Sequence, residues 1–314
     1  MKLIIQIPCF NEADALPITL SALPRKVSGF DSVEWLVIDD GSNDETLKVA
    51  KQYGVDHIVS HRQNRGLASA FMSGIEKCLT LGADVIVNTD ADNQYNSDDI
   101  PALTLPILEQ RAEFVVGVRQ IDSIDHFSLS KKMLQKLGSW VVRRASKTDI
   151  EDVTSGFRAF SRTAAQNLTV YGQYTYTLET IIQAGQKKLA ITSVPIRVNR
   201  ELRPSRLITS IPSYIWKSII TIIRIFVIYR PFRFFASIGI AMLSTGIVIG
   251  LRFMWFYLQG KGDGHIQSLI LGMAILAIGF QTILTAFVVD SVAANRKLLE
   301  DIRMKISIIG EEGI

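Results

Sequence analysis

The sequence predicts an α/β fold: a mostly parallel sheet with helices on both faces, followed by interfacial helices and a transmembrane helical hairpin. Three observations lead to this prediction. Short apolar, β-branched runs alternate with helical patterns through residues 1–210, as in parallel sheets whose strands are joined by helices. Acidic residues directly follow several of these runs. Two stretches without any charged residue, 234–251 and 266–289, lie in the last third of the chain.

The first two-thirds of the chain supplies the elements of the sheet. The first apolar run is expected to end at Pro8, because proline cannot donate a ladder hydrogen bond. Ser42 or Asn43 is expected to cap the second helix. In chain order, the predicted strands are 3–7, 34–38, 57–60, 84–89, 114–118 and 191–198, and the predicted helices are 13–27, 44–53 and 67–81.

Composition limits what the chain is expected to bind. The net charge of +4 is concentrated, because residues 200–233 hold seven Lys or Arg against one Glu. A basic segment directly before apolar spans favours a membrane surface or phosphate groups as partners and argues against nucleic acid. Cys9 and Cys78 have no metal-ligand spacing and are expected to be reduced thiols in the core.

The last third predicts a membrane anchor. Both uncharged stretches can cross a hydrocarbon core of about 30 Å, the first when it extends toward Tyr257. Basic residues precede the first stretch and follow the second, so the positive-inside rule places both ends in the cytoplasm. The run at 3–7 is too short for a signal peptide, which agrees with a cytoplasmic large domain. The alternative is a pair of buried helices in a soluble domain.

Four segments are therefore expected. Gly239, Gly246 and Gly250 would permit close helix packing, but they leave open whether the chain is a homo-oligomer. The segments are a cytoplasmic domain at 1–210, interfacial amphipathic helices at 211–232, a transmembrane hairpin at 233–292 with spans at about 234–257 and 266–289, and a cytoplasmic tail at 293–314.

The central site prediction concerns the end of the strand at 84–89. Asp90 and Asp92 follow this strand directly, two residues apart, and a polar turn comes next. Mg²⁺ and Mn²⁺ favour such hard oxygen ligands, typically one or two carboxylates together with ligand phosphates. The alternative is that both residues only form the turn.

Polar residues also follow the first two predicted strands. Asn11 and Glu12 come after the first, and Asp39 and Asp40 end the second. In parallel α/β sheets ligands bind at the carboxyl ends of the strands. Carboxylates gathered at one edge repel one another unless a cation or a ligand rich in hydrogen-bond donors lies among them. A nucleoside diphosphate with a divalent cation meets this requirement.

Five motifs, in this order, resemble those of the family 2 glycosyltransferases, which have the Rossmann-like GT-A fold. The branch they resemble most is that of the polyprenyl-phosphate glycosyltransferases, and the terminal hairpin resembles the membrane anchor of the two-helix members. The motifs are Pro8-x-Phe10-Asn11-Glu12, Asp39-Asp40-Gly41-Ser42-x-Asp44, Asn64-x-Gly66, Asp90-Ala91-Asp92-x-Gln94 and Asp152-x-x-Ser155-Gly156-Phe157-Arg158.

The resemblance implies inverting transfer of one sugar from a UDP- or GDP-sugar to a polyprenyl or dolichyl phosphate at the membrane. It implies that Asp90 and Asp92, with Gln94, hold Mg²⁺ or Mn²⁺ and the diphosphate, and that Asp152 is the catalytic carboxylate. The residues implied for the nucleotide-sugar donor are Pro8, Asn11, Glu12, Asp39, Asp40, Gly66, Asp90, Ala91, Asp92 and Arg119.

Positively charged residues are expected on the acceptor side. Arg200 and Arg206 match arginines that engage phosphate, for which a guanidinium group is well suited. Ordinary juxtamembrane charge is the alternative for both. Lys131 and Lys132 are candidates for a loop over the acceptor phosphate, against the alternative of a solvated lysine pair.

The role of Asp152 has two interpretations. A lipid phosphate is already a good nucleophile at neutral pH, so Asp152 would orient the acceptor more than deprotonate it. Alternatively, Asp152 is a structural carboxylate paired with Arg158. Two other functions stay open: transfer to a glycolipid hydroxyl, which would need Asp152 as a true base, and a catalytically silent scaffold that binds a nucleotide sugar.

Overall fold

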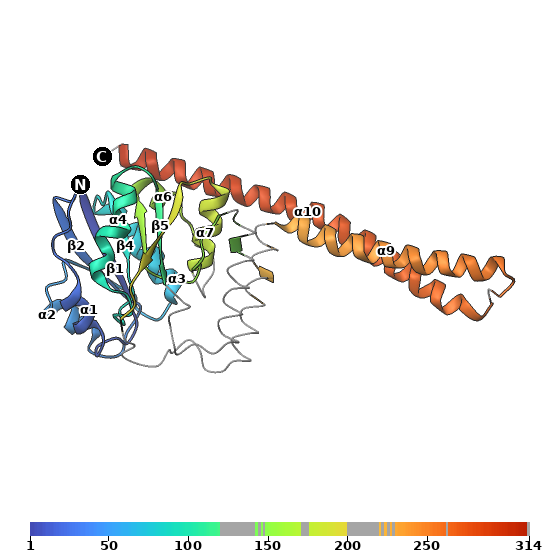
Figure 1. Cartoon of the computed structure of the whole chain (residues 1–314), viewed down its shortest axis with the longest axis horizontal. Coiled ribbons are helices and arrows are strands. Elements are labelled where there is room, and N and C mark those ends of the chain that lie inside the picture. Colours follow the sequence, from blue (N-terminus) through green and yellow to red (C-terminus); the bar gives the residue numbers. More distant parts are fainter. Residues whose placement is uncertain are drawn as a thin grey trace. The chain divides into compact units, whose positions relative to one another are not determined.

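The computed structural model describes residues 1–119, 148–170, 176–199, 230–261 and 263–312, with single positions at 142–146 and 220–227. The chain divides into two compact units, Met1–Ser218 and Ile219–Ile314. The first contains the sheet and its covering helices, and the second contains the long apolar helices (Figure 1).

The sheet of the first unit is mixed but mostly parallel, as predicted. Its seven described strands have the order β3-β2-β1-β4-β6-β5-β7. Only β6 runs antiparallel, and it pairs with β4 on one side and β5 on the other. The strands are β1 Lys2–Cys9, β2 Ser32–Asp39, β3 His57–Ser60, β4 Val85–Asn88, β5 Phe114–Arg119, β6 Arg158–Ser161 and β7 Ile191–Ile196.

Helices cover both faces of this sheet. Leu16 and Leu20 of α1 and Leu103 of α4 pack in one core with Ile5. On the other face, α3 approaches so closely that a Cβ at Gly74 would lie 2.8 Å from Ile38. The described helices of the first unit are α1 Leu16–Ala22, α2 Thr46–Gln52, α3 Leu67–Thr80, the 3₁₀ turn η1 Ser97–Asp99, α4 Ile100–Leu108, α6 Arg162–Asn167 and α7 Thr177–Gln186.

The sequence prediction of these elements was wrong in several places, and helices α4, α6 and α7 were not predicted. The helix predicted at 13–27 ends at Ala22, because Pro24 forces the residue before it into an extended conformation. The predicted cap of α2 is also wrong: the Ser42 hydroxyl accepts the Asn11 N–H, and α2 begins only at Thr46. Strand β6 was not predicted, because four residues that begin with Arg158 lack an apolar run.

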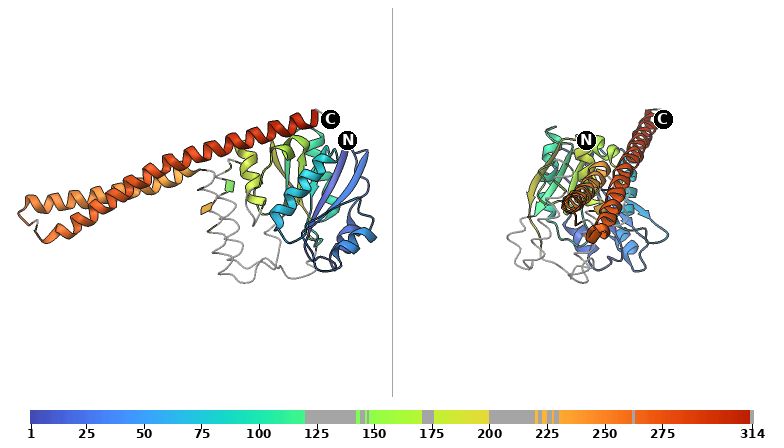
Figure 2. Two further views of the ribbon diagram at one scale, coloured as in Figure 1. Left: turned by 180° about the vertical axis from the view of Figure 1, so that it is seen from behind. Right: turned by 90° about the vertical axis from the view of Figure 1, so that its right-hand side faces the viewer.

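The second unit is a helical hairpin. It consists of α9 Pro231–Leu258, the 3₁₀ turn η3 Asp263–His265 and α10 Ile266–Glu312. The segments Pro231–Leu258 and Ile266–Arg296 are long and apolar enough to cross a membrane. Figure 2 shows α9 and α10 side by side from two directions. The predicted interfacial segment at 211–232 lies mostly outside the described residues.

Glycines set the closest approach of α9 and α10. A Cβ at Gly239 would lie 2.9 Å from the Gly279 carbonyl oxygen, and a Cβ at Gly246 would lie 3.0 Å from the Gly272 carbonyl oxygen. The two contacts run in opposite directions along the two helices, as expected for an antiparallel pair. By contrast, a Cβ at Gly250 would meet nothing within 4 Å, so this predicted packing glycine has no packing role within the described residues.

The glycine contacts give a stability prediction. Gly239→Leu should force the two helices apart and destabilise the hairpin by about 1–3 kcal/mol, the usual cost of overpacking. Gly250→Leu is the matched control, because its side chain enters open space. Thermal unfolding of the full chain in detergent measures both. Equal unfolding temperatures for the two variants would contradict the packing described here.

Candidate functional site

The site is at the carboxyl edge of the sheet. Strands β2, β1 and β4 are neighbours there, so the polar residues that end each strand come to one edge. Cys9 lies beside Asp39 in the register of β1 and β2, and Gln6 lies beside Asn88 in that of β1 and β4. The backbone therefore brings the three predicted clusters to adjacent positions.

Hydrogen bonds join the loops after β1 and β2. The backbone of Asn11 is left-handed, with φ 55°, and its side-chain Oδ1 accepts the Asn43 N–H at 2.8 Å. The Glu12 N–H donates to the Thr46 hydroxyl at 2.9 Å. Pro8 is buried inside β1, which continues through it to Cys9. The prediction that the strand ends at Pro8 is therefore wrong, because a neighbouring strand still pairs with that residue.

The two adjacent carboxylates after β2 have different surroundings. Asp39 is buried, and its oxygens accept the Ser42 N–H and the Ser60 hydroxyl, each at 3.1 Å. Both donors are uncharged, and a base or ribose could donate further hydrogen bonds to the same carboxylate. The side chain thus has a fixed orientation at the edge of the sheet.

Asp40 contacts two backbone N–H groups and the His61 side chain. It accepts the backbone N–H groups of Arg65 and Gly66 at 2.9 and 2.8 Å. Its Oδ1 also lies 2.7 Å from His61 Nδ1, and His61 Nε2 lies 3.0 Å from the Ser73 hydroxyl. Asp40 therefore holds the loop that precedes α3. A donor contact by Asp40 or by Gly66 stays a prediction.

Asp90 is a carboxylate in an unfavourable environment. Burial, together with the nearby charge of Asp92, raises the pKa of Asp90 from 3.8 to about 7, although Arg119 and Arg158 act in the opposite direction. The absence of a side chain at Gly156 makes room for this group, since a Cβ there would lie 2.9 Å from both Asp90 oxygens. The site therefore favours a proton or a cation at Asp90.

The turn after β4 is fixed by its surroundings. The buried Thr19 hydroxyl donates to the Ala91 carbonyl oxygen at 2.7 Å. Asp92 Oδ1 accepts the backbone N–H of Gln94 at 3.1 Å, and Asn93 between them is left-handed, with φ 56°. Asp92 is therefore placed by a local turn, and a metal contact by the Gln94 side chain stays a prediction.

The segment that precedes β6 takes part in a buried polar network beside Asp90. The Asn88 amide donates to the Gly156 carbonyl oxygen at 2.8 Å and to the Tyr176 hydroxyl at 2.9 Å. The Gly156 N–H donates to the Tyr95 hydroxyl at 2.8 Å. Gly156 is thus bound at both its N–H and its carbonyl group, which places it against the turn at residues 90–95. This segment is called the metal turn, because it carries the predicted metal ligands Asp90 and Asp92.

Asp152 is paired with Arg119. Its oxygens accept Arg119 Nε at 2.7 Å and Nη2 at 3.1 Å, and Nη2 also reaches the Thr154 hydroxyl at 2.9 Å. Burial by itself raises the pKa of Asp152, but the charge and hydrogen bonds of Arg119 outweigh it and hold that pKa below 3.8. Asp152 is therefore firmly ionised at neutral pH.

The alternative pairing of Asp152 with Arg158 is wrong. Arg158 is completely buried, and its guanidinium instead donates to three backbone carbonyl oxygens and one hydroxyl. Burial lowers its pKa to about 10, so it stays charged at neutral pH. The groups that accept these bonds belong to Val153, Ser155, Thr177 and Thr180.

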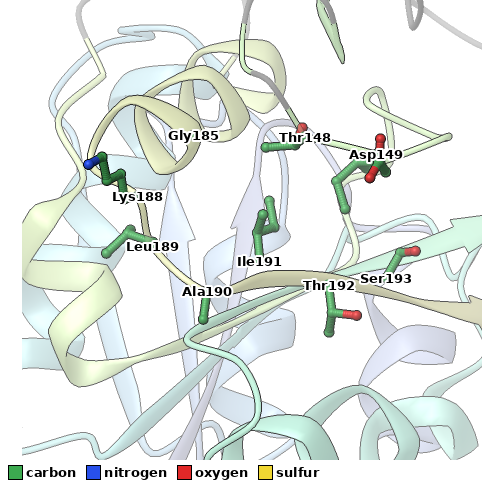
Figure 3. Close-up of a pocket in the computed structure, with 10 residues that line it drawn as sticks. Thr148, Asp149, Gly185, Lys188, Leu189, Ala190, Ile191, Thr192 and Ser193 are labelled. Atoms are coloured by element: carbon green, nitrogen blue, oxygen red, sulfur yellow. The ribbon is translucent and has the colours of Figure 1, made fainter.

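The predicted acceptor-side residues Lys131, Lys132, Arg200 and Arg206 lie outside the described residues. A cavity of ≈ 690 Å³ is lined by Thr148, Asp149, Lys188 and neighbours along the amino-terminal half of β7 (Figure 3). Since β7 runs parallel to β5, this half of β7 is at the end opposite the carboxyl edge. None of the predicted site residues lines the cavity.

The residues at the edge fit a divalent cation that is shared with a phosphate ligand. Among the described residues there is no cluster of three or more His, Cys, Asp or Glu that would enclose a metal by itself. Asp90 and Asp92 instead offer two carboxylates, and the pKa of Asp90 is raised by burial and by Asp92 although Tyr95, Arg119 and Arg158 act to lower it. Mg²⁺ and Mn²⁺ commonly take such a pair and complete their coordination with substrate phosphates and water.

The fold is the GT-A fold of glycosyltransferases. The chain belongs to glycosyl transferase family 2, whose sequence profile matches residues 4–169. It is 29% identical over 212 residues to the UDP-N-acetylglucosamine–dolichyl-phosphate N-acetylglucosaminyltransferase of Methanococcus voltae, covering 61% of this chain and 83% of that protein.

The chain is also similar to a second relative and to a solved structure. The undecaprenyl-phosphate mannosyltransferase of Micrococcus luteus is 28% identical over 219 residues, which are 66% of this chain and 88% of that one. The fold matches glucosyl-3-phosphoglycerate synthase from Mycobacterium tuberculosis, in complex with Mn²⁺, UDP and glucosyl-3-phosphoglycerate, with a TM-score of 0.55 and 19% identity. That match covers 70% of this chain and 79% of the synthase chain.

Several residues that build the site were not predicted from the sequence. Asn88, Tyr95 and Tyr176 contact Gly156 or Asp90 from three different elements. The one available signal was Asn88, a polar residue inside a β-branched run, which marks a buried hydrogen-bonded group. Tyr176 is separated from the metal turn by about 80 residues of sequence, and no pattern connects the two.

The raised pKa of Asp90 gives a pH prediction. Below that pKa a proton competes with the cation, so Mn²⁺ affinity in the presence of UDP should be at least about tenfold weaker at pH 5.5 than at pH 8. An ordinary aspartate would show no change in this range. Calorimetric titration of the full chain in detergent measures the affinity, and Asp90→Asn should bind weakly at both pH values. An unchanged affinity in the unaltered protein would contradict the electrostatics described for Asp90.

Proposed function

We propose that this protein transfers a single sugar, with inversion, from a UDP- or GDP-sugar to a polyprenyl or dolichyl phosphate at the cytoplasmic face of a membrane. One observation carries the proposal: the Asp90 carboxylate packs against Gly156 and is influenced by the charge of Arg119, which pairs with Asp152, in a chain that also has two helices long enough to cross a membrane. The relatives named for transfer to dolichyl and undecaprenyl phosphate support the choice of acceptor.

The donor is proposed to lie across the carboxyl edge from β2 to β4. Asp39, held by Ser42 and Ser60, accepts hydrogen bonds from the base or ribose. Asp90 and Asp92 hold Mg²⁺ or Mn²⁺, which when bound neutralises the diphosphate and so stabilises it as a leaving group. Glucosyl-3-phosphoglycerate synthase, which was solved with Mn²⁺ and UDP, shares the fold of this chain, and that shared fold is its support for the proposed donor position.

The acceptor phosphate is proposed to approach Arg119. A phosphate oxygen forms the new bond to the anomeric carbon as the bond from that carbon to the diphosphate breaks, and the nucleoside diphosphate leaves with the electron pair. Because Asp152 is ionised and bound by two guanidinium nitrogens, it orients Arg119 rather than accepting a proton. This role suits a phosphate acceptor, which needs little deprotonation at neutral pH.

The second unit is proposed to bring the acceptor to the site. Segments Pro231–Leu258 and Ile266–Arg296 would span the membrane, with both ends in the cytoplasm by the positive-inside rule. Arg200, Arg206, Lys131 and Lys132 are proposed to engage the acceptor phosphate, on the sequence evidence alone. The boundaries at 210, 232 and 292, and the question of a homo-oligomer, likewise stay at the level of the sequence prediction.

The proposal is tested by transfer of labelled sugar from a panel of UDP- and GDP-sugars to polyprenyl phosphate, using the full chain in detergent. We expect a lipid-extractable product from one donor with Mn²⁺ or Mg²⁺, and none with EDTA. A product that forms only on a glycolipid hydroxyl would replace the proposed acceptor. No product from any donor, with UDP still bound, would favour the silent scaffold.

The role of Asp152 gives a separate prediction. Asp152→Asn keeps the shape of the side chain but removes the charge that holds Arg119, so turnover should fall by about 100-fold or more. UDP affinity should change by less than about threefold, because Asp152 is not among the predicted donor residues and Arg119, which the sequence assigned to the donor, is proposed here to face the acceptor. Initial rates and UDP titrations measure the two effects. A loss of UDP affinity equal to the loss of turnover would indicate a structural role instead.

A further inference from the structure

One asparagine binds three successive carbonyl groups of the metal turn. The side-chain Nδ2 of Asn199 donates to the carbonyl oxygens of Asn93 at 3.0 Å and Tyr95 at 3.2 Å. Its backbone N–H donates to the carbonyl oxygen between them, that of Gln94, at 2.8 Å. No motif singled out from the sequence includes Asn199, which is separated from the turn by more than 100 residues.

The segment that carries Asn199 is anchored to the same region by other contacts. The Asn96 N–H donates to the Arg197 carbonyl oxygen at 3.3 Å, and Tyr95 and Val198 form an isolated antiparallel bridge. The Arg197 side chain binds Asp99 through Nε at 2.9 Å and Nη2 at 2.7 Å. Residues 197–199 thus run beside residues 94–99 as a short additional strand.

The turn needs such support. Asn93 has a left-handed backbone, a conformation that costs free energy in a non-glycine residue. Asp92 accepts a local hydrogen bond from the Gln94 N–H. A metal site demands ligand positions accurate to a fraction of an ångström, and supporting residues commonly provide that accuracy. The two side-chain bonds of Asn199 lie on either side of Gln94, the residue whose N–H binds Asp92, and so hold the turn from outside.

In the sequence, Asn199 directly precedes Arg200, the first of the predicted phosphate-binding arginines. The same residue is therefore fixed to the turn that carries the metal carboxylates and precedes the segment predicted to bind the acceptor. The two substrates of the proposed transfer carry phosphate groups that must approach one anomeric carbon.

We propose that Asn199 is a positioning residue of the transferase: its clamp on the Asn93, Gln94 and Tyr95 carbonyl groups sets the position of Asp92 for the metal-bound diphosphate. The inference rests on the proposed function for its ligand, but the clamp itself is tested without any ligand. Asn199 touches neither substrate in this proposal, and it acts only through the turn.

The first test is hydrogen–deuterium exchange of the full chain in detergent, without metal or nucleotide. Asn199→Leu keeps a similar volume but removes both side-chain hydrogen bonds, so amides in the peptide covering residues 92–96 should exchange at least about tenfold faster. Arg197→Gln is the matched control, because it removes the exposed ion pair to Asp99 on the same segment and leaves the clamp intact. Its exchange in this peptide should stay within about twofold of the unaltered protein.

The second test is Mn²⁺ affinity measured calorimetrically in the presence of UDP. The dissociation constant should rise about tenfold or more in Asn199→Leu and stay near that of the unaltered protein in Arg197→Gln. Asn199→Ser, which keeps one donor, should lie between them and serves as the deciding variant if Asn199→Leu does not fold.

Two results would overturn the inference. One is unchanged exchange and unchanged Mn²⁺ affinity in the Asn199 variants. The other is an equal loss in Arg197→Gln, which would mean that the segment only contributes general stability. Failure of the unaltered protein to bind Mn²⁺ with UDP would instead count against the proposed function, since the exchange experiment needs neither.

Discussion

Charge balance at the edge of the sheet where β4 and β5 end and β6 begins is the constraint on which the rest of this structure depends. Burying an ionised side chain costs several kcal/mol unless it is paired or fully hydrogen-bonded. Asp152 meets the condition through Arg119, and Arg158 meets it through four protein oxygens. Asp90 accepts a hydrogen bond from Tyr95 and is influenced by the Arg119 and Arg158 charges, yet burial and the neighbouring Asp92 still raise its pKa to about 7. A cation beside Asp90 and Asp92 would offset these two unfavourable effects.

The antiparallel strand β6 makes this arrangement possible. It enters the sheet between two strands that run the other way, so the residues before it arrive at the carboxyl edge. These residues include Asp152 and Gly156, which therefore lie beside the turn after β4. A parallel strand at the same place would have delivered its preceding residues to the opposite edge. The tight approach of Gly156 to the Asp90 carboxylate also explains why a side chain is not tolerated there.

The adjacent residues Asp39 and Asp40 have different hydrogen-bond partners and different roles. Within the described residues, Asp39 accepts two hydrogen bonds from uncharged donors, Ser42 and Ser60, whereas Asp40 is bound by two backbone N–H groups and by His61. Consecutive residues of an extended chain point to opposite sides, which separates the two roles. Asp40 holds a loop, and Asp39 lies at the ligand edge of the sheet. A similar difference separates Asp152, which pairs with Arg119, from Asp90, whose pKa is raised by burial and by Asp92.

The sequence by itself determined the class of fold, most of the strands, the long apolar helices and the gathering of acidic residues at one edge. These depend on local signals: β-branched runs, uncharged stretches, and the rule that the ends of parallel strands meet. Only the tertiary structure decided which charges pair. The sequence suggested Arg158 as the partner of Asp152, whereas the structure pairs Asp152 with Arg119 at the end of β5. Likewise, Asn199 reaches the metal turn from across more than 100 residues of sequence. Contacts of that range are set by packing and charge balance, which a linear pattern does not contain.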